Sequence, residues 1–205
     1  MRDTSSQQKT DSAPWEQAER LKCIIDGTNI GTWEWNVQTG ETTFNERWAE
    51  IIGYRLEELA PVDINTWLNH AHPDDLRESG VRLERHFSGE TPFYDYQCRM
   101  RHKSGRWVWV HDRGRVVSWT DEGKPLMMYG THADISEQKE AEQALLASRD
   151  KLEKMTQQLP GVVYQFQQWP DGHFAFPYAS ESIYQIYGVT PEQVRHDASA
   201  VFSVI

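Results

Sequence analysis

The feature that most constrains this chain is an internal repeat, in which one pattern occurs twice at a changing offset. The first copy begins at Gly31, in Gly-Thr-Trp-Glu-Trp, and reaches a second glycine at Gly53, whereas the second copy begins at Gly161 and reaches Gly188. The first pair of glycines is 130 residues apart and the second pair 135, so the second copy is five residues longer around its first hairpin. A chain of 205 residues that repeats in this way predicts one complete domain and part of another.

The second copy has no counterpart for much of the first. At the later offset Ile205 stands opposite His70, so nothing corresponds to residues 71–134. We therefore expect residues 160–205 to be the N-terminal half of a second, truncated domain, and the output part of a longer protein to be missing. Such a half would leave aromatic side chains on its surface: Phe166, Phe174, Phe176 and Tyr178.

Composition excludes several classes of protein. A net charge of −10 argues against a nucleic-acid partner, which requires clustered Lys and Arg. No run approaches the roughly 18 apolar residues that span a bilayer, and the polar N-terminus is no secretory signal. The two cysteines, Cys23 and Cys98, give no disulfide framework. We expect a cytoplasmic location, while membrane segments outside this sequence stay open.

The N-terminal residues precede the first copy. Residues 1–11 are polar and without periodicity, which predicts disorder. Residues 12–26 predict a short amphipathic helix, with Ser12 as its cap and Pro14 in its first turn.

The first copy opens with signals for a hairpin and a helix. Residues 32–37 alternate Trp33 and Trp35 with polar residues, as a half-buried strand does, and Gly40 lies in a turn. Asn45 can cap the following helix, which Gly53 ends.

A longer helix follows, and then three strands. His72-Pro-Asp-Asp predicts the helix start, with Val81, Leu83 and Phe87 facing inward. From residue 93 the apolar period becomes two, and tight turns separate residues 93–101, 106–119 and 126–133, which predicts an antiparallel meander. We therefore predict an α+β fold: a five-stranded antiparallel sheet with helices on one face, within residues 27–136.

Residues 137–159 predict a connecting coiled-coil helix. Two apolar series repeat every seven residues, and they are offset by four, as the core positions of a coiled coil are. A solvated single helix is the alternative, because a serine weakens one core layer. The predicted core positions are Ala141, Leu145, Ser148, Leu152, Met155 and Leu159.

Taken in order, these segments resemble a PAS domain with its PAC extension, as found in bacterial sensor histidine kinases and diguanylate cyclases. The resemblance covers residues 27–136, and residues 159–164 and 176–181 resemble parts of the first half of another such domain. The segments that carry it are Gly31-Thr-Trp-Glu-Trp, residues 48–54, His72-Pro-Asp-Asp, Lys103-Ser-Gly-Arg-Trp, residues 109–114 and residues 130–135.

The resemblance implies stimulus sensing and signalling by a homodimer that forms through the linker helix and the PAS domain. We expect this fragment not to be an enzyme, because no nucleophile–base pair, Walker loop or metalloprotease helix is present. The resemblance leaves open that the full-length protein is a diguanylate cyclase or a histidine kinase.

Histidines near the long helix invite metal or haem hypotheses. His70 and His72 lie near Asp74 and Asp75, but a helix start accounts for this cluster, so we expect no metal site. His86 lies where some relatives place a haem ligand, yet no second motif supports haem.

The positions of the two cysteines argue against covalent flavin photochemistry. A light-sensing cysteinyl adduct would need a cysteine between the short helices and the long one, and neither Cys23 nor Cys98 lies there. Non-covalent flavin or another small ligand stays open.

Aromatic residues surround the predicted space between helices and sheet, which is the ligand pocket in some relatives. Because each indole buries roughly 150–250 Å², we expect a filled core without a cofactor. The candidate pocket and core residues are Trp33, Trp35, Trp48, Trp67, Phe87, Tyr94, Tyr96 and Cys98.

The candidate relay is the segment Asp134, Ile135 and Ser136, where the last strand becomes helix. Asp134 can cap that helix or pair with an arginine, and so act as a hinge. The alternative is a ligand-free dimerisation module that spaces a downstream enzyme.

Overall fold

The computed structural model describes residues 5–157, 159 and 161–202. The chain divides into two compact units between Lys139 and Glu140. Among the described residues, no helix has the length and apolar character that crossing a membrane requires.

The first unit contains one five-stranded antiparallel sheet, as the sequence predicts. Its strand order is β2-β1-β5-β4-β3, so the first hairpin joins the meander through β1, which pairs with the last strand, β5. The strands are β1 (Gly31–Asn36), β2 (Thr42–Phe44), β3 (Tyr94–Arg101), β4 (Trp107–Trp119) and β5 (Pro125–Asp134).

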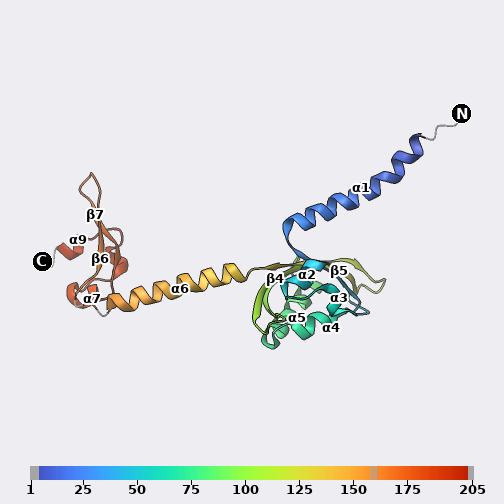
Figure 1. Ribbon diagram of the computed structural model, residues 1–205. Coiled ribbons are helices and arrows are strands. Elements are labelled where there is room, and N and C mark those ends of the chain that lie inside the picture. Colours follow the sequence, from blue (N-terminus) through green and yellow to red (C-terminus); the bar gives the residue numbers. More distant parts are fainter. Residues whose placement is uncertain (1–4, 158, 160, 203–205) are drawn as a thin grey trace. The chain divides into compact units, whose positions relative to one another are not determined.

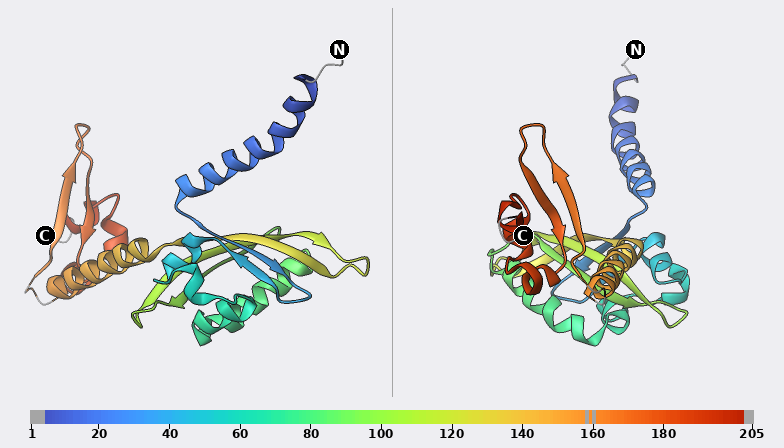
Figure 2. Two further views of the ribbon diagram at one scale, coloured as in Figure 1. Left: turned by 45° about the vertical axis from the view of Figure 1, so that its right-hand side comes forward. Right: turned by 90° about the vertical axis from the view of Figure 1, so that its left-hand side faces the viewer.

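Four helices lie on one side of this sheet (Figure 1), and the left view of Figure 2 shows them below it. Two of them begin at the predicted caps. The Asn45 side chain accepts a hydrogen bond from the Trp48 amide, and His72 accepts one from the Asp74 amide. The helices are α2 (Glu46–Ile51), α3 (Leu56–Leu59), α4 (Ile64–His70) and α5 (Pro73–Phe87).

The core lies between the helices and the sheet. Strand β3 alternates as predicted: Tyr94, Cys98 and Met100 are buried, whereas Asp95 and Gln97 are exposed.

Helix α5 corrects one prediction, because Val81 is exposed. The buried positions of this helix are Asp75, Ser79 and His86, which follow helical spacing and all carry polar side chains. Each of them has a hydrogen-bond partner, so a polar face can be buried here. Val81 lies away from that face, while Leu83 and Phe87 are partly buried against the core as expected.

Helix α1 (Ser5–Thr28) is longer than the predicted helix. It includes residues 5–11, which corrects their predicted disorder, and residues 1–4 lie outside the described residues. The segment is polar but contains no Gly or Pro, the residues that most oppose helix, so absence of an apolar period did not mean absence of helix.

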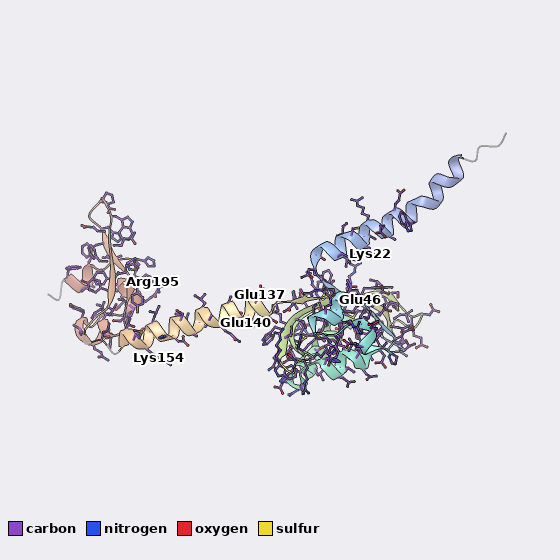
Figure 3. All side chains as sticks on the ribbon, in the orientation of Figure 1. Lys22, Glu46, Glu137, Glu140, Lys154 and Arg195 are labelled. Carbon is purple, nitrogen blue, oxygen red and sulfur yellow. The ribbon has the colours of Figure 1, made fainter. Side chains whose placement is uncertain are left out.

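Helix α6 (Ser136–Gln157) follows β5 directly. Residues 140–155 are all exposed, and Glu140 and Lys154 project from the helix (Figure 3). Leu159, a predicted coiled-coil position, lies beyond the end of the helix, because the residue before a proline avoids the helical conformation.

The second unit continues from α6 into a hairpin and three short helices. One predicted exposure is wrong: Phe176 is buried in a small cluster with Ile183, Val194 and Val201. Phe166 and Tyr178 are exposed as expected. The elements are β6 (Tyr164–Gln168), β7 (Phe174–Ala179), α7 (Ser182–Tyr187), α8 (Pro191–Val194) and α9 (Ser199–Phe202).

Candidate functional site

Trp33 lies across the two central strands of the first unit. It pairs with Gly130 of β5, and Gly114 of β4 lies opposite that same glycine. A Cβ atom at Gly114 or Gly130 would come within 2.5 and 2.2 Å of the Trp33 indole. Two residues without side chains therefore make room for this ring.

A buried polar group holds the edge of the same indole. Trp33 Nε1 donates to Asp112 Oδ1 at 2.9 Å, and His132 Nε2 lies 3.1 Å from the same oxygen. Asp112 is 4% exposed and His132 2% exposed, so both partners are removed from water. The carboxylate of β4 and the imidazole of β5 thus satisfy each other inside the domain.

A second buried pair connects α5 to β3. The hydroxyl groups of Ser79 and Tyr94 are 2.9 Å apart. Burial raises the pKa of Tyr94 far above its ordinary value, and the negative charge of Asp112 raises it further. Tyr94 is therefore a neutral hydrogen-bonding group.

These residues border a cavity of about 330 Å³. The cavity corrects the expectation of a completely filled core. Apolar and aromatic side chains make up most of its lining, and all helices that cover the sheet except α3 contribute. The lining residues are Trp33, Trp35, Thr42, Phe44, Trp48, Ile64, Trp67, Leu68, Ser79, Leu83, Tyr94, Asp112 and His132.

The predicted pocket and core residues divide between the cavity lining and the packed core beside it. Trp33, Trp35, Trp48, Trp67 and Tyr94 line the cavity. Three predicted members do not: Phe87 packs against Trp35 with ring centres 6.4 Å apart, Tyr96 lies under the Arg82 guanidinium, and Cys98 is fully buried in the core.

Sequence reasoning missed the carboxylate and the imidazole of the lining, Asp112 and His132. A signal was present, because both residues fall on the inward phase of their strands. Asp112 lies on the same face of β4 as Val108 and Val110, and His132 lies on the same face of β5 as Met128. All five side chains are buried. The polar side chains of Asp112 and His132 hid this phase from a search for apolar alternation.

The strand-to-helix junction lies on the same two strands. Ile135 N donates to Trp109 O at 2.9 Å, and Trp109 N donates to Ser136 Oγ at 3.1 Å. Asp134 Oδ1 accepts from the Ser136 amide at 2.9 Å, and Lys139 lies over the Trp109 ring. The first turn of α6 is thereby attached to β4 as well as to β5.

The histidines considered for metal and haem have local partners. In His86, Nδ1 contacts Thr91 O at 2.9 Å and Nε2 accepts from Val116 N at 3.0 Å, so both ring nitrogens bond the backbone. His70 Nδ1 contacts Thr66 O at 2.7 Å. In the part of the chain that the structure describes, no three His, Cys, Asp or Glu side chains are grouped to hold a metal ion.

A five-stranded antiparallel sheet in this order, with helices on one face and an aromatic cavity beneath them, defines an α+β domain. The profile of the family described as PAS fold matches residues 41–132. A solved sensory box histidine kinase/response regulator from Burkholderia thailandensis is 30% identical, with a TM-score of 0.58 over 66% of this chain and 98% of that chain. The chain belongs to the PAS fold family.

The chain is also similar in sequence to parts of longer signalling proteins. The sensor protein FixL of Bradyrhizobium diazoefficiens is 22% identical over 197 residues, which cover 89% of this chain and 37% of that protein. The probable diguanylate cyclase DgcE of Escherichia coli is 32% identical over 101 residues, 48% of this chain and 9% of that protein. The chain thus spans well under half of these relatives. Its PAS domain is a signal-transduction sensory module, and such a domain is not itself catalytic.

Proposed function

We propose that this chain senses a stimulus in the aromatic cavity and relays it through the β5–α6 junction to an output domain of a signal-transduction protein. The cavity change alters the packing of β4 and β5. Asp134, Ile135 and Ser136 act as the hinge that passes this change into α6.

The observation that carries the proposal is that the same two strands, β4 and β5, line the cavity and also bond the start of α6. Asp112 of β4 and His132 of β5 line the cavity and contact each other. Three residues before Asp112 on β4, Trp109 bonds Ile135 and Ser136. A small shift between the two strands at the cavity would therefore change the bonds that start the helix.

The hinge itself depends on short polar contacts. The first amides of a helix have no partner inside the helix. Asp134 supplies one acceptor and thereby fixes where α6 begins. Loss or gain of this bond would change the position at which the helix starts and the direction in which it leaves the sheet.

Dimerisation and output complete the proposal. Leu145 and Leu152 are 72% and 61% exposed on α6, which suits a coiled coil between two copies in a cytoplasmic homodimer. Residues 161–202 would act as the first half of a second PAS domain. A histidine kinase or a diguanylate cyclase would be the output, in keeping with the relatives.

A cavity-filling variant tests the relay without any ligand. Leu83→Phe places extra volume on the α5 wall of the cavity, and Leu68→Phe does so from α4. We expect both variants to change amide exchange at Trp109 and over residues 134–145. Val81→Phe is the matched control, because Val81 is on α5 but exposed.

A substitution of the proposed hinge residue, Asp134, is the second part of this experiment. Asp134→Ala should abolish the change that Leu83→Phe causes in residues 136–145, while Asp121→Ala, in the exposed β4–β5 turn, should leave it intact. Removal of such a capping group typically costs about 0.5–2 kcal/mol, so the domain should stay folded. Exchange that changes only around the cavity in both filling variants would contradict the relay.

The exposed leucines also support the second candidate function, a ligand-free dimerisation module. In that case Leu145→Glu would disrupt the dimer, measured by light scattering, and the two cavity-filling variants would have no effect on α6. The relay requires an effect from both kinds of change.

A further inference from the structure

The tryptophans that line the cavity of the first unit present carbon atoms to it. Trp35 of β1, Trp48 of α2 and Trp67 of α4 all belong to the lining. In each of them the Nε1 atom exposes less than 1 Å², so protein atoms cover it and a molecule in the cavity could not reach it. The fourth indole, that of Trp33, donates its N–H to Asp112 Oδ1 at 2.9 Å. Ring carbons are therefore the part of these residues that a molecule in the cavity would contact.

The other polar side chains of the lining bond within the protein. The hydroxyl groups of Ser79 and Tyr94 are 2.9 Å apart, and Thr42 Oγ1 donates to a backbone carbonyl at 3.1 Å. His132 Nε2 lies 3.1 Å from Asp112 Oδ1. A polar molecule would lose its hydrogen bonds to water on entering and gain few in return, which costs free energy. The lining therefore selects against polar and charged molecules.

Helix α4 lies over this cavity with an apolar face. Ile64, Trp67 and Leu68 follow helical spacing, and all three line the cavity. Yet among residues 64–70 none is buried, and Leu68 is 39% exposed, so the cavity reaches the surface at this helix. By contrast α2 and α5, which also line the cavity, each bury three residues. An apolar molecule beneath α4 would remove its face from water, which is the main driving force for apolar association.

The volume of the cavity sets the size of such a molecule. It is about 330 Å³, near the lower end of the roughly 300–1,000 Å³ of small-molecule pockets. An engineered apolar cavity of about 150 Å³ in another protein stays dry and binds benzene. The present cavity is about twice as large, so a molecule larger than benzene suits it.

We infer that the cavity binds an uncharged, hydrocarbon-like molecule of about two fused rings in size, which makes no hydrogen bond to the protein and is covered by α4. The inference rests on the proposed sensory role of this cavity and names the ligand class for it. Aromatic and aliphatic side chains hold the molecule by burial alone, and its binding holds α4 against the sheet.

Three probes of the same ring size test the class on the whole chain. Naphthalene is a pure hydrocarbon, quinoline has one ring nitrogen that accepts hydrogen bonds, and 2-naphthoate carries a negative charge. We expect one naphthalene to bind per chain, about tenfold more tightly than quinoline, because the buried nitrogen finds no donor. We expect 2-naphthoate to bind most weakly. Isothermal titration measures the three affinities.

Amide exchange shows where the probe binds. Naphthalene should slow exchange over residues 64–70 several-fold, because α4 gains buried surface and opens less often. Residues 121–124, in the exposed β4–β5 turn, are the internal control and should exchange at an unchanged rate.

Cavity-filling substitutions provide an independent assignment. Leu83→Phe on α5 and Leu68→Phe on α4 each add volume to the lining, so each should weaken naphthalene binding by about tenfold or more. Val81→Phe is the matched control, because Val81 is exposed on α5 and does not line the cavity. Thermal melting confirms that each variant is folded, and the second filling variant replaces one that is not.

Three results would overturn the inference. Quinoline or 2-naphthoate bound as tightly as naphthalene would show that the cavity offers a polar partner. Unchanged naphthalene affinity in both filling variants would place the probe outside the cavity, and binding of none of the probes would remove the ligand class. The filling variants test the relay without a ligand through exchange over residues 134–145, so failure of the relay can be told apart from these outcomes.

Discussion

Residues 31–70 and 161–202 contain the same series of elements, but only the first series is covered by further strands of its own unit. Helix α3 of the first region and α8 of the second match residue for residue at the later offset. Gly53 and Gly188, which match at the same offset, both have positive φ, at 79° and 72°. The local signals of the repeat therefore produce the same local structure twice.

Long-range pairing separates the two regions. β1 pairs with β2 on one side and with β5 on the other, and Trp33 is 8% exposed. In the described part of the second unit β6 pairs with β7, and all five residues of β6 are exposed. The difference teaches that the hairpin and short helices are specified locally, whereas the cavity requires the meander β3–β5.

The largest expected effect concerns the two most buried equivalent positions, Trp48 and Ile183. Trp48→Ala should lower the free energy of unfolding of the first region by about 3–5 kcal/mol, because a large cavity is left in a rigid core. Ile183→Ala should lower that of the second region by about 2 kcal/mol, since its small cluster can collapse around the gap. Urea denaturation followed region by region through amide exchange measures both. If Trp48→Ala also unfolded residues 161–202, the two regions would share one core.

A smaller effect on the free energy of unfolding is expected from breaking one ion pair in each unit. Asp75 bonds Arg99 at 2.6 and 2.9 Å and joins α5 to β3, elements without a described counterpart in the second unit. Burial acts to raise the pKa of Asp75, but hydrogen bonds from Arg99 and its positive charge hold that pKa below the ordinary value of 3.8. The exposed pair Arg195–Glu192 of the second unit should matter little.

We expect Asp75→Asn to cost about 1–3 kcal/mol at pH 7, and Glu192→Gln at most about 0.5 kcal/mol. Because the folded pKa is depressed, the contribution of Asp75 is present above pH 3.8 and is lost as the pH falls through the lower folded value. Melting temperatures between pH 7 and 2 check this. An Asp75→Asn variant with the same acid dependence as the wild-type chain would show that the pair does not stabilise the fold.

The smallest effect concerns the matched glycines. Alanine at Gly188 meets no atom within 4 Å, so only the left-handed backbone opposes it, at about 1 kcal/mol. Alanine at Gly53 would also come within 2.2 Å of the His102 ring. We expect Gly53→Ala to cost about 1 kcal/mol more, and His102→Ala to remove that excess in a double-mutant cycle. Equal costs in the wild-type background would contradict the packing difference.

Much of this fold could be predicted from the sequence, because its signals are local. Asn45 and His72 marked helix starts, and period-two alternation gave the inner face of β3. Hydropathy failed on α5, since that helix buries Asp75 and Ser79 through specific bonds and exposes Val81. A bonded polar group is as compatible with burial as an apolar one, and the sequence does not show its partner.

The site was less predictable than the fold. The inward tryptophans were found, but the cavity between them depends on how ring volumes fit together in three dimensions. The Asp112–His132 contact joins residues of two strands, and only the register of β4 against β5 places them together. The hinge role of Asp134 and the coiled coil of α6 stay predictions.

The most direct measurement is native-state amide exchange across the whole chain in a monomeric sample. The account predicts that β1, β4 and β5 exchange only through global unfolding of the first region, whereas β6 exchanges through small local openings. Protection of β6 equal to that of β1 would contradict the claim that pairing with the meander, and not the repeated local elements, makes the first region a complete domain.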